Sequence, residues 1–288
     1  MTAPSVSFTD WDWEPTILAG IAAACLLYAL AMRRGWLRGD DDLRPWSLTP
    51  ATRALLFYTG VLICFLALCS PIDPISDQYL LSVHMLQHML LMMVAPPLLV
   101  LGVAGAPSPP PGFAPRLRRF WTAVTRPLPA FFLFNLDLVV WHWPAFYDAT
   151  LYNEGLHACE HITFMAVGLV LWWPVVDPIR GEGIIPVAPM RKIVLLALSG
   201  LPSTVLGLLF ALAPDPVYSF YAQAPRLWGI SALTDQQIAG VVMLVAGTVV
   251  GFLGISAVFL RMLNSPEEDE RNLEAERAAP AVAARDPG

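Results

Sequence analysis

Charged residues are scarce in this chain, and their scarcity excludes a soluble fold. Only 14% of its 288 residues are Asp, Glu, Lys or Arg, whereas a soluble domain carries about 25%. Hydrophobic residues make up 56% and the mean hydropathy is +0.58, so the charged residues could not cover a water-exposed surface. The net charge of −6, with basic residues dispersed between apolar segments, also excludes a nucleic-acid-binding surface. The composition therefore predicts a polytopic membrane protein.

The signatures of a disulfide framework and of common enzymes are missing as well. The four cysteines show no CxxC spacing and fall within or at the edge of apolar segments, as buried free thiols do. The chain has no HExxH motif, no nucleophile elbow and no glycine-rich phosphate loop, so we expect it not to be an enzyme. Residues 1–14 hold Asp10, Asp12 and Glu14 but no basic residue, which is unlike a cleavable signal peptide. We expect them to form a short extracytoplasmic N-terminus.

Seven apolar runs are long enough to cross a bilayer as helices, for which about 20 residues are needed. They predict an all-α fold, a polytopic transmembrane helical bundle whose membrane domain covers residues 15–263. The charged tail, residues 264–288, is expected to form a short cytoplasmic helix that frays into disorder. The seven predicted spans are Pro15–Met32, Thr52–Ser70, Tyr79–Val103, Pro129–Tyr147, Leu156–Val176, Arg191–Leu212 and Gln236–Met262.

The basic residues predict the orientation of the bundle, because Lys and Arg in short loops stay on the cytoplasmic side. All but one of the 17 basic residues lie in alternate connections or in the tail, and the exception is Arg226. The N-terminus is therefore predicted to be outside and the C-terminus inside, in a cell membrane. The basic residues on the predicted inner side are Arg33, Arg34, Arg38, Arg44, Arg53, Arg116, Arg118, Arg119, Arg126, Arg180, Arg191, Lys192, Arg261, Arg271, Arg277 and Arg285.

The predicted loops differ between the two sides. Ala106–Arg126 holds four prolines followed by Gly112, which predicts an extended cytoplasmic loop without a helix. The outer loops are acidic, and a solvated acidic rim there would attract cations or a basic partner. The acids of this rim are Asp73, Asp77, Asp148, Glu154, Asp215 and Asp235.

All five histidines of the chain fall in or beside three consecutive predicted spans. His84 and His88 lie on the third span, His142 near the end of the fourth, and His157 and His161 at the start of the fifth. With the predicted orientation and a rise of 1.5 Å per residue, all five lie within roughly 15 Å of the outer surface. Ionisable residues inside a membrane indicate a functional site, so we expect the five imidazoles to form one.

The histidine spacing favours a metal site. His84/His88 and His157/His161 are i,i+4 pairs, which place both rings on one helix face. Met85 and Met89 project from the adjoining strip of the same helix, and thioether with imidazole suits Cu(I). Two further residues are expected to support the ligands from outside, as hydrogen-bonding partners do in metal sites. These are Glu160, three residues after His157, and Asn135, seven residues before His142.

Four stretches of the chain resemble a known family. They are Ser82–Leu90 continuing to Ala95-Pro96-Pro97, Trp141–Pro144 with Tyr147-Asp148, His157–His161 leading to Trp172-Trp173-Pro174, and Ala232–Gln237. Together they resemble the CtaG family of the caa3-oxidase type, membrane proteins of cytochrome c oxidase assembly. The resemblance implies a role in making the copper-containing centre of an aa3- or caa3-type oxidase. It implies an oxidase subunit or another copper chaperone as the partner.

Two other functions remain open from the residues alone. The paired histidines could hold haem b by bis-His ligation across the bundle, which would make the protein an electron carrier. Bulky Leu81, Met92 and Phe164 beside the histidines leave little room for the macrocycle. The same polar cluster could instead line a path for metal ions or protons, which would make the protein a transporter.

Overall fold

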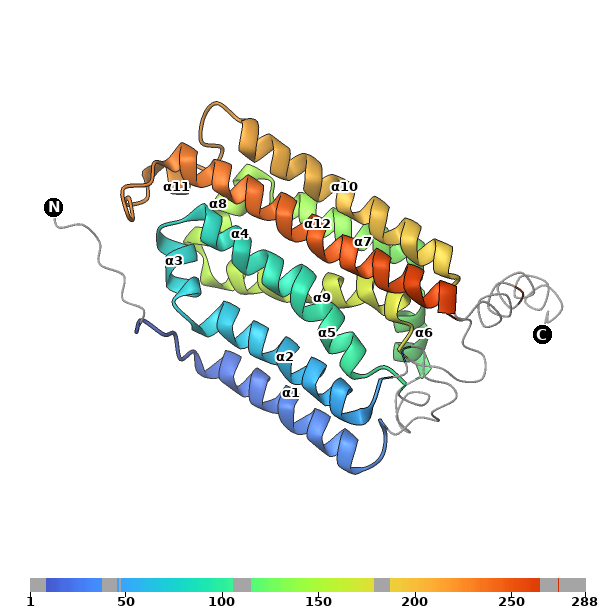
Figure 1. The fold of residues 1–288 in the computed structure, drawn as a ribbon. Helices are drawn as coiled ribbons and strands as arrows, with labels where there is room; N and C mark the ends of the chain where they lie inside the picture. Colours follow the sequence, from blue (N-terminus) through green and yellow to red (C-terminus); the bar gives the residue numbers. More distant parts are fainter. Residues whose placement is uncertain are drawn as a thin grey trace.

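The computed structural model describes residues 9–37, 46, 48–105, 115–178, 187–264 and 274. Within these ranges the chain is helical and has no strand. Long helices run side by side, and the short helices α3, α8 and α11 gather at one end of the bundle (Figure 1). The helices are α1 Pro15–Arg33, α2 Pro50–Cys69, α3 Ile72–Gln78, α4 Leu81–Met89, α5 Ala95–Gly102, α6 Pro115–Val124, α7 Pro127–Trp141, α8 Pro144–Tyr152, α9 Glu154–Val176, α10 Pro189–Leu212, α11 Ser219–Gln223 and α12 Ala232–Asn264.

The architecture confirms the all-α, multi-span prediction. Six stretches are long and apolar enough to cross a membrane: α1, α2, the continuous helix Leu81–Gly102, α9, α10 and α12. A seventh span results if α6 and α7, which are bent by 75° relative to each other, count as one. The direction in which the bundle crosses the membrane stays a prediction.

The predicted fourth span, Pro129–Tyr147, is wrong at its end. Helix α7 stops at Trp141, and α8 begins at Pro144 after a break at His142 and Trp143. The cause is Pro144, because the residue before a proline is held away from the helical region. Trp143 has φ −66° and ψ 126°, which is extended backbone. His142 therefore caps α7 instead of lying within a helix.

The predicted helix-free loop Ala106–Arg126 is also corrected by the structure. Its second half forms α6, a helix of 10 residues. Prolines favour the first turn of a helix, where their missing N–H is not needed, and Pro115 starts α6 in this way. The proline run itself and most of the tail lie outside the described residues.

Close approach of α9 to the helix Leu81–Gly102 is possible because Gly168 has no side chain. A Cβ at Gly168 would lie 2.5 Å from the carbonyl oxygen of Met92. Small residues let membrane helices pack backbone to backbone. Gly207 plays the same part between α10 and α12, since a Cβ there would lie 2.9 Å from the carbonyl oxygen of Gly240. The first contact brings the two histidine-bearing helices together.

The start and the end of α4 are both unusual. The Asp235 carboxylate, from α12, accepts hydrogen bonds from Leu81 N at 2.7 Å and Ser82 N at 3.0 Å. Asp235 is 2% exposed, so it caps α4 and is not part of a solvated acidic rim. After α4 the chain forms a π-helical turn, Leu90–Val94, just before Pro96 and Pro97, which have no N–H to continue the α-helical pattern.

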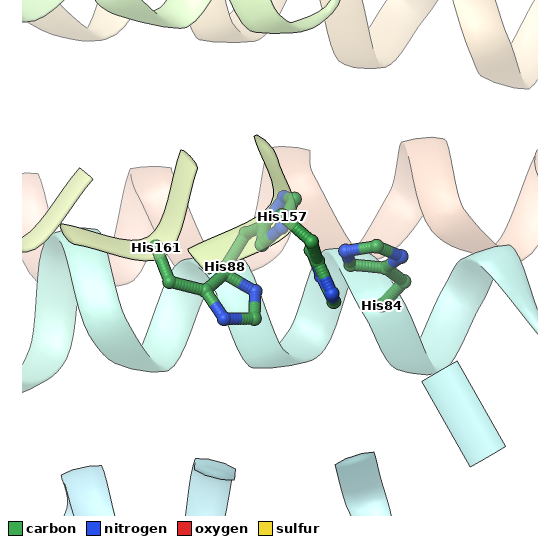
Figure 2. A group of neighbouring side chains, drawn as sticks. All are labelled: His84, His88, His157 and His161. Carbon is green, nitrogen blue, oxygen red and sulfur yellow. The ribbon is translucent and has the colours of Figure 1, made fainter. Parts of the chain in front are cut away.

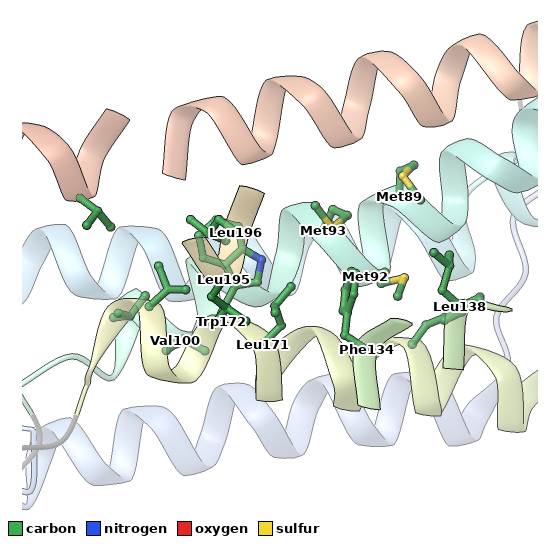
Figure 3. Close-up of a cluster of buried hydrophobic side chains, with 14 of the residues drawn as sticks. Met89, Met92, Met93, Val100, Phe134, Leu138, Leu171, Trp172, Leu195 and Leu196 are labelled. Atoms are coloured by element: carbon green, nitrogen blue, oxygen red, sulfur yellow. The ribbon is translucent and has the colours of Figure 1, made fainter. Parts of the chain in front are cut away.

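Beyond the histidines the bundle is filled by an apolar cluster. Figure 3 shows Met92, Phe134 and Leu171 packed between the helices, with Trp172 and Leu196 further along. The members of this cluster are buried side chains from α4 to α12. The bundle therefore has a polar region around α3, α4 and α11 and an apolar cluster beyond it.

Candidate metal centre

Four imidazoles from two helices meet in the interior of the bundle. His84 and His88 come from α4, His157 and His161 from α9, and one ring nitrogen of each lies within 4.8 Å of the others. Figure 2 shows the four rings facing one another between the two helices. The ring centroids are 4.2 Å apart within each i,i+4 pair and 5.2 to 5.4 Å apart for His84–His157 and His88–His161. The structure thus brings together four of the five histidines.

The tautomer of His84 follows from its hydrogen bonds. The Tyr221 hydroxyl donates its single proton to the carbonyl oxygen of Ser76 at 2.6 Å. It can therefore only accept from His84 Nδ1, which lies 2.7 Å away. With the proton on Nδ1, the lone pair of His84 is on Nε2, which is buried and has no hydrogen-bond partner among the described residues. A histidine held in this way is ready to bind a metal ion through Nε2.

A carboxylate lies beside the histidine pair of α9. His157 Nδ1 lies 3.4 Å from the Oδ2 atom of Asp77, on α3, and the His157 side chain is 12% exposed. A carboxylate beside Nδ1 favours the proton on that nitrogen and leaves Nε2 free to coordinate. From the sequence, Asp77 was placed only on the acidic outer rim, and Tyr221 was not predicted. The i,i+4 pair Asp73/Asp77 just before the histidine helix was a signal for the first, and no local signal existed for Tyr221.

Unpartnered nitrogens are concentrated at this point. Both ring nitrogens of His88, and Nε2 of His84, His157 and His161, are buried without hydrogen-bond partners within the described ranges. Buried polar atoms almost always have partners, and exceptions call for an explanation such as an ion. Among the described residues, Oε1 of fully buried Glu160 lies within ion-pair distance of His88, 3.8 Å from Nε2. A bound cation would satisfy the nitrogens and balance this carboxylate.

The other predicted site residues lie outside the group of four. The His142 ring centroid is 6.2 Å from that of His88, and its Nδ1 donates to the carbonyl oxygen of Leu138 at 2.8 Å. Asn135 donates to the carbonyl oxygen of Phe131, and it has no hydrogen bond to a histidine in the part of the chain described here. Met85 and Met89 are buried in two different apolar clusters.

A hydrogen-bond network lies at the α3 end of the site. Gln87, between the two histidines of α4, donates to Asp73 Oδ1 at 2.7 Å and to the carbonyl oxygen of Ala67 at 2.9 Å. Burial, helped by the nearby charge of Asp77, raises the pKa of Asp73 to about 7. Burial also raises the pKa of Asp77, although His157 opposes the shift. The carboxyls beside the site are thus uncharged more readily than ordinary aspartates.

Asp148, Tyr147 and Gln236, which belong to the stretches that resemble the family, contact the segment that leads into α11. Asp148 accepts hydrogen bonds from Ser219 N and Phe220 N at the start of α11, which carries Tyr221. Tyr147 stacks on Tyr218 with ring centroids 3.9 Å apart. Gln236 accepts from Val217 N at 2.6 Å. These contacts place Tyr221 over His84.

Two curated relatives are similar to most of this chain. They are the uncharacterised proteins Mb0105 of Mycobacterium bovis and MT0111 of Mycobacterium tuberculosis, each 26% identical over 291 residues. The alignments cover 83% of this chain but 41% of each relative, so the chain spans about two fifths of their length. No solved structure matches.

The family comparison agrees with the motifs and confirms the resemblance drawn from them. The profile described as cytochrome c oxidase caa3 assembly factor (Caa3_CtaG) matches residues 26–265. This range covers most of the chain and includes all five histidines and both residues, Asp77 and Tyr221, that contact them. The chain therefore belongs to the family of caa3 cytochrome c oxidase assembly factors.

Proposed function

We propose that this protein binds copper at the four-histidine group and passes it on during the assembly of an aa3- or caa3-type cytochrome c oxidase. The observation that carries the proposal is the convergence of four ring nitrogens within 4.8 Å of one another. Family membership supports the assembly role. The copper, and the site that binds it, are our inference from the ligand chemistry.

The donor set suits a copper ion that is bound only for a time. Imidazole binds Cu(I) and Cu(II) well, and a neutral histidine loses no proton on binding at pH 7. Met85 and Met89, on the adjoining face of α4, are soft donors that would join only if their side chains left the apolar clusters. Asp77 and Tyr221 would hold two ligands in the metal-binding tautomer. We expect the cargo to come from, or go to, an oxidase subunit or another copper chaperone, without a catalysed reaction.

The geometry favours a copper site over haem b. Haem ligation needs two histidines with a flat open slot between them, whereas here one ring nitrogen of each of the four histidines lies within 4.8 Å of the others. The His88 ring also packs on Phe164 at 4.7 Å between centroids, which fills the space on that side. The extra two histidines have no role in a bis-His haem site.

A path through the membrane is also disfavoured by the packing. The described side chains that follow the histidines along the bundle are Met92, Phe134, Phe164, Leu171 and Trp172, all 4% exposed or less. Such an apolar plug offers an ion no ligand. His157 and Asp77 are partly exposed at the α3 end, with side chains 12% and 32% exposed, whereas His84 and His88 are fully buried. Access from that end suits uptake and release on the same side, which the charge distribution predicts to be the outer side of the cell membrane.

Metal analysis of the purified protein tests the proposal. Protein purified in detergent under reducing conditions should hold copper and show no Soret band. His84→Ala with His88→Ala should abolish copper binding, whereas His142→Ala, outside the group of four, should retain it. A Soret band lost in His88→Ala would establish the haem function instead. Retention of copper by the double variant would place the site elsewhere.

Oxidase assembly in cells provides the second test. His88→Ala or His161→Ala should leave this protein in the membrane at normal abundance, while oxidase activity and oxidase copper content fall together. Added copper should restore both in part. Normal oxidase activity with a normally abundant His88→Ala protein would contradict copper delivery, and metal uptake into sealed vesicles would then test transport.

A further inference from the structure

Helix α6 differs from every span of the bundle. None of its 10 residues is buried, and it bends by 75° away from α7. The bend has a local cause, since Pro127 starts α7 and holds Arg126 in extended backbone with φ −67° and ψ 149°. Thr125 closes the preceding turn by donating from both N and Oγ1 to the carbonyl oxygen of Trp121. The direction of α6 is therefore built into the chain.

The sequence of α6 separates apolar from basic residues around the helix. Leu117, Phe120, Trp121 and Val124 follow i, i+3, i+4, i+7 spacing and form a stripe about 100° wide. Arg116, Arg118 and Arg119 all lie outside this stripe, and α6 has no acidic residue. Helices of this kind lie in the plane of a membrane interface, with apolar side chains in the acyl boundary and basic ones among headgroups.

The apolar stripe is not covered by the rest of the protein. Phe120 is 61% exposed and Leu117 is 49% exposed. Trp121 and Val124 are half-buried, and Trp121 packs edge to face on Trp173 near the end of α9, with centroids 5.0 Å apart. Figure 1 shows α6 at the end of the bundle opposite α3, α8 and α11, beside the end of α5. This is where a span leaves the hydrocarbon, so the exposed side chains meet the lipid boundary.

We propose that α6 is an interfacial helix that binds the headgroups of anionic lipids through Arg116, Arg118 and Arg119. The argument for lipid as the occupant is charge complementarity, since three guanidinium groups lie within four residues and no carboxylate of α6 offsets them. Anionic leaflets attract such basic segments. Phe120 and Leu117 insert beside the acyl chains, and Trp121 fixes the helix to the bundle. The inference is independent of the metal site.

Hydrogen exchange in nanodiscs tests the proposal on the full chain. One copy per disc is reconstituted either in phosphatidylcholine alone or with about a third phosphatidylglycerol. We expect amide exchange in residues 115–124 to slow about tenfold in the anionic discs, given the attraction of a few basic residues to a charged surface. The triple variant R116Q/R118Q/R119Q should lose this difference, and R116K/R118K/R119K should keep it.

Two further variants separate the possible outcomes. R33Q/R34Q removes two exposed charges at the end of α1 and should leave the exchange of α6 unchanged. Phe120→Ser should speed exchange in both lipids, because the apolar anchor is weakened. Equal exchange in the two lipids for the unmodified protein would overturn the proposal. Protection that appears only with two copies per disc would identify a second copy of the chain as the occupant and would overturn it too.

Discussion

The helix Leu81–Gly102 contains two regions with opposite chemistry, separated by the π-helical turn Leu90–Val94. In α4 the buried side chains include His84, Gln87 and His88, and Tyr221 and Asp73 from other helices hydrogen-bond His84 and Gln87. In α5 the buried residues are Ala95, Pro96, Val100 and Gly102. The two histidines of α4 belong to the four-histidine group, whereas the buried residues of α5 pack against neighbouring helices. The comparison teaches that polarity in this bundle follows a site and is not spread along the helix.

The largest expected effect comes from breaking the polar region. His84→Ala with His88→Ala removes two of the four converging imidazoles. Loss of a residue that only hydrogen-bonds a ligand can lower metal affinity by about 100-fold, and we expect the double variant to lose more than this. Each single variant should lose less, because an i,i+4 partner remains. Equilibrium competition with a Cu(I) chelator measures the change. Equal affinity of the single and double variants would contradict a shared site.

A substitution in the apolar cluster that includes Val100 of α5 and Leu171 should lower the free energy of unfolding and leave copper affinity unchanged. Leu171→Ala leaves a void where the side chain is 1% exposed, and we expect a loss of about 2–4 kcal/mol in the free energy of unfolding. Leu208→Ala, at a side chain that is 44% exposed, serves as the control and should cost much less. Denaturant unfolding in detergent and the chelator competition are measured on both. A loss of copper affinity in Leu171→Ala with an intact fold would mean that the regions are not separate.

A smaller effect is expected where an outer partner is removed. Tyr221→Phe deletes the acceptor of the His84 Nδ1 proton, so the ring can adopt the other tautomer, and copper affinity should fall about 10- to 100-fold. Tyr218→Phe is the matched control, because that buried hydroxyl donates to the carbonyl oxygen of His142 and is not hydrogen-bonded to a histidine ring. Competition experiments on both compare the two hydroxyls. Equal losses would show a packing effect in place of control of the tautomer.

The smallest expected effect concerns the carboxyl of Asp73. Its folded pKa is raised from 3.8 to about 7, so its contribution to stability is present below about pH 4 and is lost as the pH rises towards 7. Asp73→Asn keeps an oxygen acceptor for Gln87 and should flatten this decrease. Thermal unfolding in detergent between pH 4 and 8 records it. An unchanged pH profile in the variant would show that Asp73 does not titrate in this range.

Periodicity and composition predicted the fold class because each span must be apolar over its whole length. The predicted ends were wrong where a local feature interrupted the pattern. Pro144 ended α7 before His142, and α6 formed after the proline run because its four apolar residues recur at helical spacing. Asp235 was expected on a solvated rim, yet it caps α4 across the bundle. A carboxylate in a loop has no sequence mark that distinguishes these two environments.

For the candidate site, the i,i+4 spacing by itself determined that each histidine pair shares a helix face, because the helix has 3.6 residues per turn. Shared depth also followed from the positions of the spans. Only the tertiary structure decided that α9 approaches the helix Leu81–Gly102 at Gly168. It also decided that His142 stays outside the group and that Tyr221 and Asp77 contact His84 and His157. The last two contacts join side chains 137 and 80 residues apart in the chain, and no local periodicity encodes the distance between two helices.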